Sequence, residues 1–221
     1  MSRIARLVIP NLPHHITQHG NGRRKVFYDD GDYLTFRELL AASCKQAKVS
    51  CWAYALLPNH IHAILVPKTE DGLSAALAPV HRRYAGMINA RQNKTGHFWQ
   101  GRYGAAVMDE SHLMAAFRYI IRYPVEAGLA DTPAKYKWSS AGAYLKGIDD
   151  GLTDVGSMFT RLPDMKHFLT RETLDLDEFI VRDDETIGRP RGTEKFIRSL
   201  ERKTGRNLMP EKRGPKLAKK K

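Results

Sequence analysis

The stretch VSCWAYALLPNHIHAILV, residues 49–66, decides the fold of this 221-residue chain. Residues 49–57 form an apolar run of strand length, and residues 60–66 begin by alternating histidine with aliphatic side chains. Pro58 and Asn59 separate the two runs. They favour a tight turn, because proline presets its backbone φ angle and asparagine tolerates turn conformations. We therefore predict two antiparallel strands joined as a hairpin.

Strand and helix patterns flank this hairpin in a regular order, strand, helix, strand, strand, helix, strand and a further helix. This is the order of a ferredoxin-like βαββαβ unit with one added helix. The predicted fold class is therefore α+β, with an antiparallel sheet, an added C-terminal helix and a basic tail. Outside the hairpin, the patterns indicate strands at 14–19 and 98–108 and helices at 29–48, 72–93 and 109–123, the last ended by Pro124.

The formal net charge of +12 suggests an anionic partner, of which nucleic acid is the usual one. Residues 1–148 carry 19 basic and 10 acidic side chains, residues 149–185 carry 4 and 11, and residues 186–221 carry 13 and 3. This distribution divides the chain into a folded domain at 1–148, an acidic connecting segment at 149–185 and a basic C-terminal extension at 186–221. The extension is expected to contact DNA.

The cellular setting follows from what the sequence lacks. No apolar stretch approaches the roughly 20 residues of a membrane helix, and the opening residues do not resemble a signal peptide. The two cysteines, Cys44 and Cys51, are too few for a disulfide framework, which favours a reducing compartment. We therefore expect a cytoplasmic, nucleoid-associated protein that makes no contact with a membrane.

His60 and His62 are the first candidates for chemistry. Their spacing of two in a strand puts both imidazoles on one face, with Ile64 on the same side and Ala63 and Leu65 opposite. A buried imidazole needs polar partners, and a divalent metal held between two histidines would supply one. A pair of hydrogen-bonded structural histidines explains the spacing equally simply.

Tyr119 is the second candidate, on the helix that follows the last strand. Its neighbours Arg118 and Arg122 are basic. A phenol, with a pKa near 10, is a poor nucleophile unless a metal or cation assists it. Taken singly, Tyr119 is better interpreted as a core aromatic beside Phe117 and Ile120.

Taken together, several stretches resemble one family: HHITQHGNGRRKVFYDDGDY (14–33), LLPNHIHAILV (56–66), HFWQGRY (97–103) and FRYIIRYPVEAGL (117–129). They resemble the single-tyrosine HUH transposases of the IS200-like kind, in particular the REP-associated tyrosine transposases. The resemblance covers roughly residues 9–147 in order and spacing, and the basic tail is similar to the extension of many such proteins. It implies an HUH-endonuclease fold in which the added helix is catalytic.

The resemblance also implies residue roles. His60 and His62 match the pair that binds Mg²⁺ or Mn²⁺, and Tyr119 matches the nucleophile. Tyr123 falls where the family has Asn, Gln or Glu as a third metal ligand, which is a departure, because a neutral phenol is a weak ligand for a hard cation. Either Tyr123 contributes weakly, or the coordination shell is completed by water or by Asp109, Glu110 or Glu126.

The implied activity is cleavage and rejoining of single-stranded DNA through a 5′-phosphotyrosine intermediate, on hairpin or palindromic repeat DNA, by a monomer or homodimer. Two alternatives stay open. A domesticated relative would bind a DNA hairpin without cutting it, and Tyr123 keeps this reading open. A rolling-circle replication initiator would use Tyr119 and Tyr123 as paired tyrosines, although the flanking Pro124 and Val125 favour the transposase pattern.

DNA contacts are expected from basic and polar side chains, each of which is otherwise a solvated surface group. Trp99 and Tyr103 are candidates for base stacking, although Trp99 is more typical of a core residue. The tail is loosely similar to minor-groove-binding AT-hook segments, and an unstructured solubilising tail fits equally well. The expected contacts are Arg23, Arg24 and Lys25 after the first strand, Arg82 and Arg83 on the second helix, Gln100 and Arg102 on the last strand, Arg118 and Arg122 beside Tyr119, and Arg189, Arg191, Lys212 and Arg213 in the tail.

Overall fold

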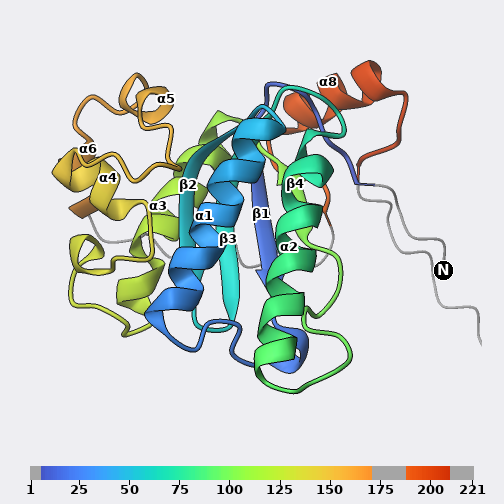
Figure 1. Ribbon diagram of the computed structural model, residues 1–221. Helices are drawn as coiled ribbons and strands as arrows, with labels where there is room; N and C mark the ends of the chain where they lie inside the picture. Colours follow the sequence, from blue (N-terminus) through green and yellow to red (C-terminus); the bar gives the residue numbers. More distant parts are fainter. Residues whose placement is uncertain (1–5, 171–187, 210–221) are drawn as a thin grey trace, which may run out of the picture.

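A computed structural model describes residues 6–170 and 188–209 as a four-stranded antiparallel sheet with helices on both faces (Figure 1). The strand order is β2-β3-β1-β4, and every neighbouring pair is antiparallel. This order, with one helix before β2 and another before β4, confirms the predicted ferredoxin-like unit. Within the described ranges, no helix combines the length and apolar character needed to cross a lipid bilayer.

The element bounds follow the predicted order closely. The chain forms β1 (His14–His19), η1 (Asn21–Arg23), α1 (Asp30–Gln46), β2 (Val49–Leu57), β3 (His60–Pro67), α2 (Gly72–Arg91), β4 (Gly104–Val107), α3 (Glu110–Glu126), η2 (Pro133–Lys135), α4 (Ala141–Lys146), α5 (Gly156–Phe159), α6 (Met165–Thr170) and α8 (Glu194–Thr204).

The sheet separates two hydrophobic cores. On one face, α1 and α2 pack against Ile61, Ala63 and Leu65 of β3. On the other face, α3, α4 and α6 pack against Ile64 and Val66. Because side chains alternate along a strand, His60 and His62 share the α3 face with Ile64. The predicted division of this strand between two faces is confirmed.

The last strand is shorter than predicted. Only residues 104–107 form β4, whereas 98–108 was expected. Trp99 makes a single bridge to Gly20, and its indole N–H donates to the carbonyl oxygen of His81 on α2 (3.0 Å). The chain then leaves the sheet near Gly101, a residue type that weakens strands because it has no side chain to pack.

Helix α3 is longer than predicted. It was expected to end before Pro124, but it continues to Glu126. Proline removes one backbone N–H donor and crowds the preceding turn. The turns after it stay hydrogen bonded, since Ala127 N–H donates to the Tyr123 carbonyl and Leu129 N–H donates to the Pro124 carbonyl, both at 2.8 Å. Pro124 is buried, so packing offsets the lost bond.

The described part of the acidic segment, residues 149–170, is folded onto α3 and β2. Met158, Met165 and Leu169 are buried in the same core as Tyr119. The Tyr54 hydroxyl on β2 donates to Asp150 (3.0 Å), and the backbone of β2 bonds to residues 138, 140 and 154. The outer edge of β2 is therefore covered by the chain's own later segments.

The described part of the C-terminal extension is folded too. Arg191 bridges Met108 next to β4, its N–H donating to the Val107 carbonyl and its carbonyl accepting from Asp109 N–H. Helix α8 follows and begins at a capping Thr193, whose hydroxyl accepts from the Phe196 N–H. Leu200 and Leu208 then form a small core with Leu7 and Ile9, so the two ends of the described chain pack together. The predicted three-part division of the chain stays a prediction.

Candidate active site

Pairing of β1 with β3 gathers four histidines on the face that α3 covers. His19 lies opposite His60 and Thr17 opposite His62 in the strand register. The rings of His19 and His60 stack at a centroid distance of 5.0 Å, and those of His15 and His62 at 5.2 Å. The sequence patterns singled out only His60 and His62. The alternation in HHITQH was a signal for His15 and His19, but only strand pairing shows that they join the site.

Both histidines of the predicted metal pair are held through Nδ1. The His60 Nδ1 lies 2.6 Å from Asn59 Oδ1, and the His62 Nδ1 lies 3.0 Å from His15 Nε2. An amide oxygen only accepts hydrogen bonds, so the His60 Nδ1 carries the proton and its Nε2 carries the lone pair. Ligating histidines are commonly held in this way, with the far nitrogen fixed by a polar neighbour.

His62 has the environment of a neutral ligand. Burial, followed by the nearby His15, His60 and His19, holds the pKa of His62 well below its usual value. Its Nε2 is buried and has no hydrogen-bond partner among residues 6–170 and 188–209. A buried polar atom without a partner is uncommon and calls for an explanation. A lone pair on a neutral imidazole is a donor that divalent metals accept, so the residues present fit a metal ion.

Tyr119 and Tyr123 of α3 face these histidines. Their spacing of four places them on the same side of the helix. The Tyr119 ring lies 5.5 Å from the His62 ring, and the Tyr123 ring lies 5.4 Å from His60 and 5.6 Å from His62. Tyr119 is only 1% exposed, whereas Tyr123 is partly exposed. The predicted nucleophile and the departure from the family pattern thus both lie at the histidine pair.

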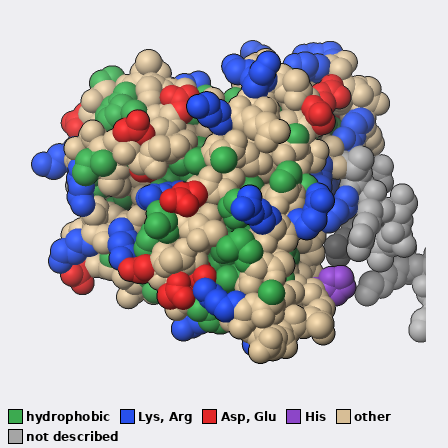
Figure 2. Space-filling model, viewed as in Figure 1, with side chains coloured by type: hydrophobic (Ala, Val, Ile, Leu, Met, Phe, Trp, Pro, Cys, Tyr) green, Lys and Arg blue, Asp and Glu red, His purple; other side chains and the backbone are tan. Residues whose placement is uncertain are grey.

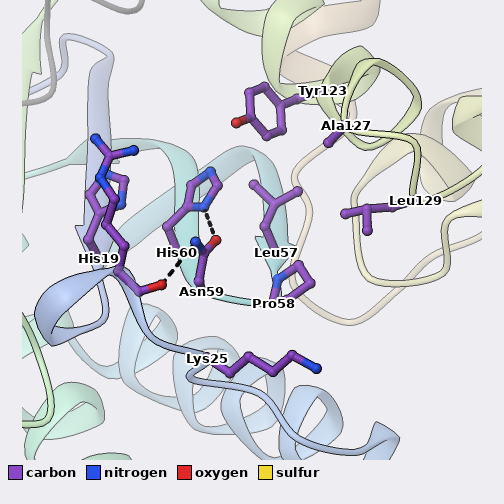
Figure 3. A pocket seen from close by; sticks show the side chains of 10 residues that line it. His19, Lys25, Leu57, Pro58, Asn59, His60, Tyr123, Ala127 and Leu129 are labelled. Carbon is purple, nitrogen blue, oxygen red and sulfur yellow. Dashed lines mark hydrogen bonds between the residues drawn. The ribbon is translucent and has the colours of Figure 1, made fainter.

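A cavity of about 360 Å³ opens beside this cluster. Figure 3 shows Tyr123 and His60 on one side of it and Lys25 across from them, with the Tyr123 hydroxyl directed toward the part where His60 and His19 lie. A second hollow adjoins it through His19 and Arg23 and is lined mainly by polar groups. Its other lining residues are Thr17, Gln18, Gln100, Gly101, Arg102 and Gly104.

Several residues predicted to contact DNA surround these two hollows. Arg23 and Lys25 line the cavity, and Gln100 and Arg102 line the second hollow. The Arg24 guanidinium donates to the His97 carbonyl at 2.5 Å, in the loop before Gln100. Three of these five residues follow β1 and two precede β4, so the fold brings together two loops that are far apart in the sequence.

Arg118 and Arg122 are engaged inside the protein. The Arg118 guanidinium lies 4.0 Å above the Phe168 ring, and Arg122 donates to the Leu169 carbonyl at 3.2 Å. Arg122 also lies 3.7 Å from the Glu126 carboxylate. Helix α6 therefore covers the two cations that flank Tyr119 in the sequence.

The remaining predicted contacts lie away from the site or outside the described residues. Arg82 and Arg83 are exposed on α2, on the opposite face of the sheet. Figure 2 shows that face, with Lys and Arg side chains spread among Asp and Glu. Arg189 is exposed, and Arg191 pairs with the end of β4, where Val107 lies opposite His14 rather than opposite the residues that face His60 and His62. Lys212 and Arg213 lie outside the described residues.

The two aromatic candidates for base stacking belong to the core. Trp99 is packed on the α1 and α2 side of the sheet and bonded to the His81 carbonyl. Tyr103 is 8% exposed, and the Arg6 guanidinium lies 3.7 Å over its ring. Neither side chain lines the two hollows, and Trp99 is packed as its core interpretation expects. Base stacking by either residue stays a prediction.

The acidic alternatives for a third metal ligand are also occupied. Asp109 caps α3 and accepts from the N–H groups of His112 and Thr193. It lies ten residues before Tyr119, or about 15 Å along the helix. Glu110 pairs with Arg161, and Glu126 lies beside Arg122. Among residues 6–170 and 188–209, no group of three or more His, Cys, Asp or Glu side chains is arranged to hold a metal.

Comparison with known proteins gives a related fold and a family. A search of curated proteins finds no match. A solved structure of a REP-associated tyrosine transposase bound to a REP hairpin is 19% identical, with a TM-score of 0.56, over 70% of this chain and 93% of that one. At this identity the likeness shows the fold. A proposed transposase from Deinococcus radiodurans R1 is 18% identical, with a TM-score of 0.39, over 54% and 95% of the two chains.

The family model described as "Transposase IS200 like" matches residues 8–122. That range runs from the segment before β1 into α3, and it includes the histidine pair and Tyr119. It ends one residue before Tyr123, where the resemblance implies a departure from the family pattern. Since the match covers more than half of the sequence, this chain belongs to the IS200-like transposase family.

Proposed function

We propose that the chain is a single-strand DNA endonuclease and strand transferase that forms a 5′-phosphotyrosine at Tyr119. The observation that carries the proposal is the approach of the Tyr119 ring to the His62 ring, at 5.5 Å, on the face where four histidines gather. A phenol oxygen close to two imidazoles supports phosphoryl transfer, which needs an oxygen nucleophile and a source of positive charge.

His60 and His62 would hold the metal through Nε2, with Tyr123 as a weak third ligand. A bound Mg²⁺ or Mn²⁺ supplies positive charge to a non-bridging phosphate oxygen and to the phenol, which lowers the barrier to attack. Asn59 and His15 hold the two rings from behind. The carboxylates of Asp109, Glu110 and Glu126 have other partners, so the two histidines and Tyr123 are the residues that would hold the metal.

The cleavage step exchanges one bond to phosphorus for another. The Tyr119 oxygen forms a bond to phosphorus as its phenol proton passes to solvent, the bond from phosphorus to the 3′-oxygen breaks, and solvent returns a proton to that oxygen. The departing 3′-oxygen takes up a proton and becomes a free hydroxyl, leaving the 5′-phosphate on Tyr119. A 3′-hydroxyl from another DNA end reverses the step. In-line attack needs an accessible, bent backbone, which favours single-stranded substrate.

Hairpin or palindromic repeat DNA is the proposed partner. The solved relative with the same fold was bound to a REP hairpin. In this chain, Arg23, Lys25 and Arg102 line two adjoining hollows that His19 also lines, where they can neutralise phosphates. The protein would act on DNA as a monomer or a homodimer, inside the cytoplasm.

One observation favours the second candidate, a hairpin-binding protein that does not cut. Tyr119 is 1% exposed, so cleavage requires the phenol to become accessible when DNA binds. Incubation with an end-labelled single-stranded hairpin and Mn²⁺, followed by a denaturing gel, separates the two functions. A covalent protein–DNA band supports the transferase. Tight binding with no such band at any Mn²⁺ concentration supports the binding protein.

Two substitutions of Tyr123 should have different effects on Mn²⁺ binding and on cleavage. If its phenol is a weak ligand, Tyr123→Asn should tighten Mn²⁺ binding, since an amide oxygen suits a hard cation better. Tyr123→Phe should then change the cleavage rate by less than about fivefold, because roughly 1 kcal/mol of interaction is lost. Cleavage rates of both variants, measured across Mn²⁺ concentrations, test this.

The same variants test whether Tyr123 is a second nucleophile. It is the more exposed of the two tyrosines and lines the cavity. In that case Tyr123→Phe would cripple strand transfer, and Tyr119→Phe would keep part of the adduct. A Tyr123→Asn rate below wild type at every Mn²⁺ concentration would contradict the weak-ligand interpretation.

Residues 210–221, the last part of the basic C-terminal extension, are expected to add salt-dependent DNA affinity. Residues 210–221 contain six basic and one acidic side chain. Truncation after Met209 keeps α8 and its contacts with Leu7 and Ile9, so the fold is preserved. Each phosphate that the tail neutralises contributes roughly 0.7–0.9 to the slope of log affinity against log salt concentration. A hairpin-binding titration at several salt concentrations should show weaker binding and a flatter slope. An unchanged slope would mean that these residues do not touch DNA.

A further inference from the structure

The two histidines of the candidate metal pair are held by different kinds of neighbour. His60 is held by Asn59, the adjacent residue in the turn between β2 and β3. His62 is held by His15, which lies 47 residues away on β1 and opposite Ile64 in the register. Both His15 and His62 are buried, at 2% and 0% exposure, and their rings stack with an angle of 14° between their planes.

The 3.0 Å contact joins His15 Nε2 to His62 Nδ1, so one proton is shared between two nitrogens. A neutral imidazole has one N–H and one lone pair. If His62 donates, its Nε2 bears the lone pair toward α3. If His15 donates, the His62 Nε2 bears a proton and has no acceptor among the described residues. Only the first arrangement allows His62 to bind a metal.

We infer that His15 is a positioning residue of the metal site, accepting the His62 Nδ1–H through its own Nε2 and so presenting the His62 Nε2 lone pair to the metal. The inference rests on the metal site of the proposed function and adds a residue to it. His15 itself stays behind the His62 ring, since its Nε2 is used by that bond.

Asn59 and His15 therefore differ in how strictly they determine which ring nitrogen of their partner histidine carries the proton. The Asn59 Oδ1 is an acceptor in every state, so it fixes the His60 tautomer on its own. The His15 Nε2 accepts only in one of the two tautomers of His15. Replacement of His15 should for this reason alter metal binding through His62 and leave His60 oriented.

Two variants of His15 distinguish the contribution of its acceptor nitrogen from that of its stacked ring. His15→Phe keeps an aromatic ring to stack on His62 but removes the acceptor, and His15→Gln supplies an amide oxygen that can accept. Calorimetric titration with Mn²⁺ should show binding roughly 10- to 100-fold weaker for His15→Phe, the usual range for loss of such a neighbour. His15→Gln should stay within about fivefold of wild type, because its oxygen restores the bond.

His81→Phe is the matched control. His81 is a partly buried histidine on α2, on the opposite face of the sheet, where its ring contacts Phe36. The His81→Phe variant should bind Mn²⁺ with the same affinity as the wild type. Thermal unfolding without metal shows whether each variant is folded.

A second measurement needs no variant and no metal. Nitrogen-15 NMR of the metal-free wild type reports which nitrogen of His62 carries the proton, and a proton on Nδ1 is expected. A proton on Nε2 would overturn the inference, as would Mn²⁺ binding by folded His15→Phe equal to wild type. If the wild type binds no Mn²⁺, the proposed metal site fails. The NMR result then still supports or overturns the role of His15 in setting the tautomer.

Discussion

Replacing Tyr119 by phenylalanine is expected to abolish the covalent protein–DNA adduct. The change removes only the phenol oxygen, which is the atom proposed to attack phosphorus. The ring would still pack against His62 and Tyr123, both within 5.5 Å between centroids. Cleavage should fall by at least roughly 1000-fold, or about 4 kcal/mol in activation free energy. Hairpin affinity should change by less than about fivefold, because at most one hydrogen bond is lost.

The measurement is a denaturing gel of labelled hairpin DNA after incubation with Mn²⁺, with binding followed separately under native conditions. Tyr28→Phe is a suitable control, since Tyr28 is exposed and its hydroxyl donates to the Lys25 carbonyl near the cavity. An adduct that survives boiling in detergent with Tyr119→Phe would show that another residue is the nucleophile. Tyr123 would then be the first to test.

His60→Ala and His62→Ala should each remove Mn²⁺-dependent cleavage. Each variant deletes one of the two imidazoles proposed to hold the metal, and the loss of a ligand weakens metal binding sharply. Mn²⁺ affinity should fall by more than roughly 100-fold, or about 2.7 kcal/mol. Calorimetric titration of each purified variant with Mn²⁺ measures this directly.

The His62→Ala variant should also be less stable than the wild type. The His62 ring is fully buried, so His62→Ala leaves a cavity and should lower the unfolding temperature. His62→Gln, which keeps a polar side chain of similar length, should lose metal binding with a smaller loss of stability. Titration curves identical to wild type for both His60→Ala and His62→Ala would assign the pair a purely structural role.

Much of the fold could be predicted from the sequence because its signals are local. The turn at Pro58-Asn59 and the alternation after it located β2 and β3, and the same alternation assigned Ile61 and Ile64 to opposite cores. Errors arose where tertiary contacts outweigh local preference. The 98–108 strand breaks because Trp99 packs on α2, and α3 continues through Pro124 because that proline is buried.

The site was less predictable than the fold. His60 and His62 share a strand, so their spacing alone places them together. His15 and His19 belong to another strand, and their approach depends on the register of β1 with β3, which no local pattern specifies. The engagement of Arg118 by Phe168 was equally hidden, since it depends on how residues 149–170 fold back onto α3.

The coverage of the outer strands has a consequence for self-association. An open strand edge offers unpaired N–H and C=O groups to another molecule, and this is a common route to aggregation. Here the edge of β2 is bonded to residues 138, 140 and 154, and the end of β4 is bonded to Arg191. Two copies of the chain therefore cannot join their sheets along these stretches without first displacing their own backbone partners.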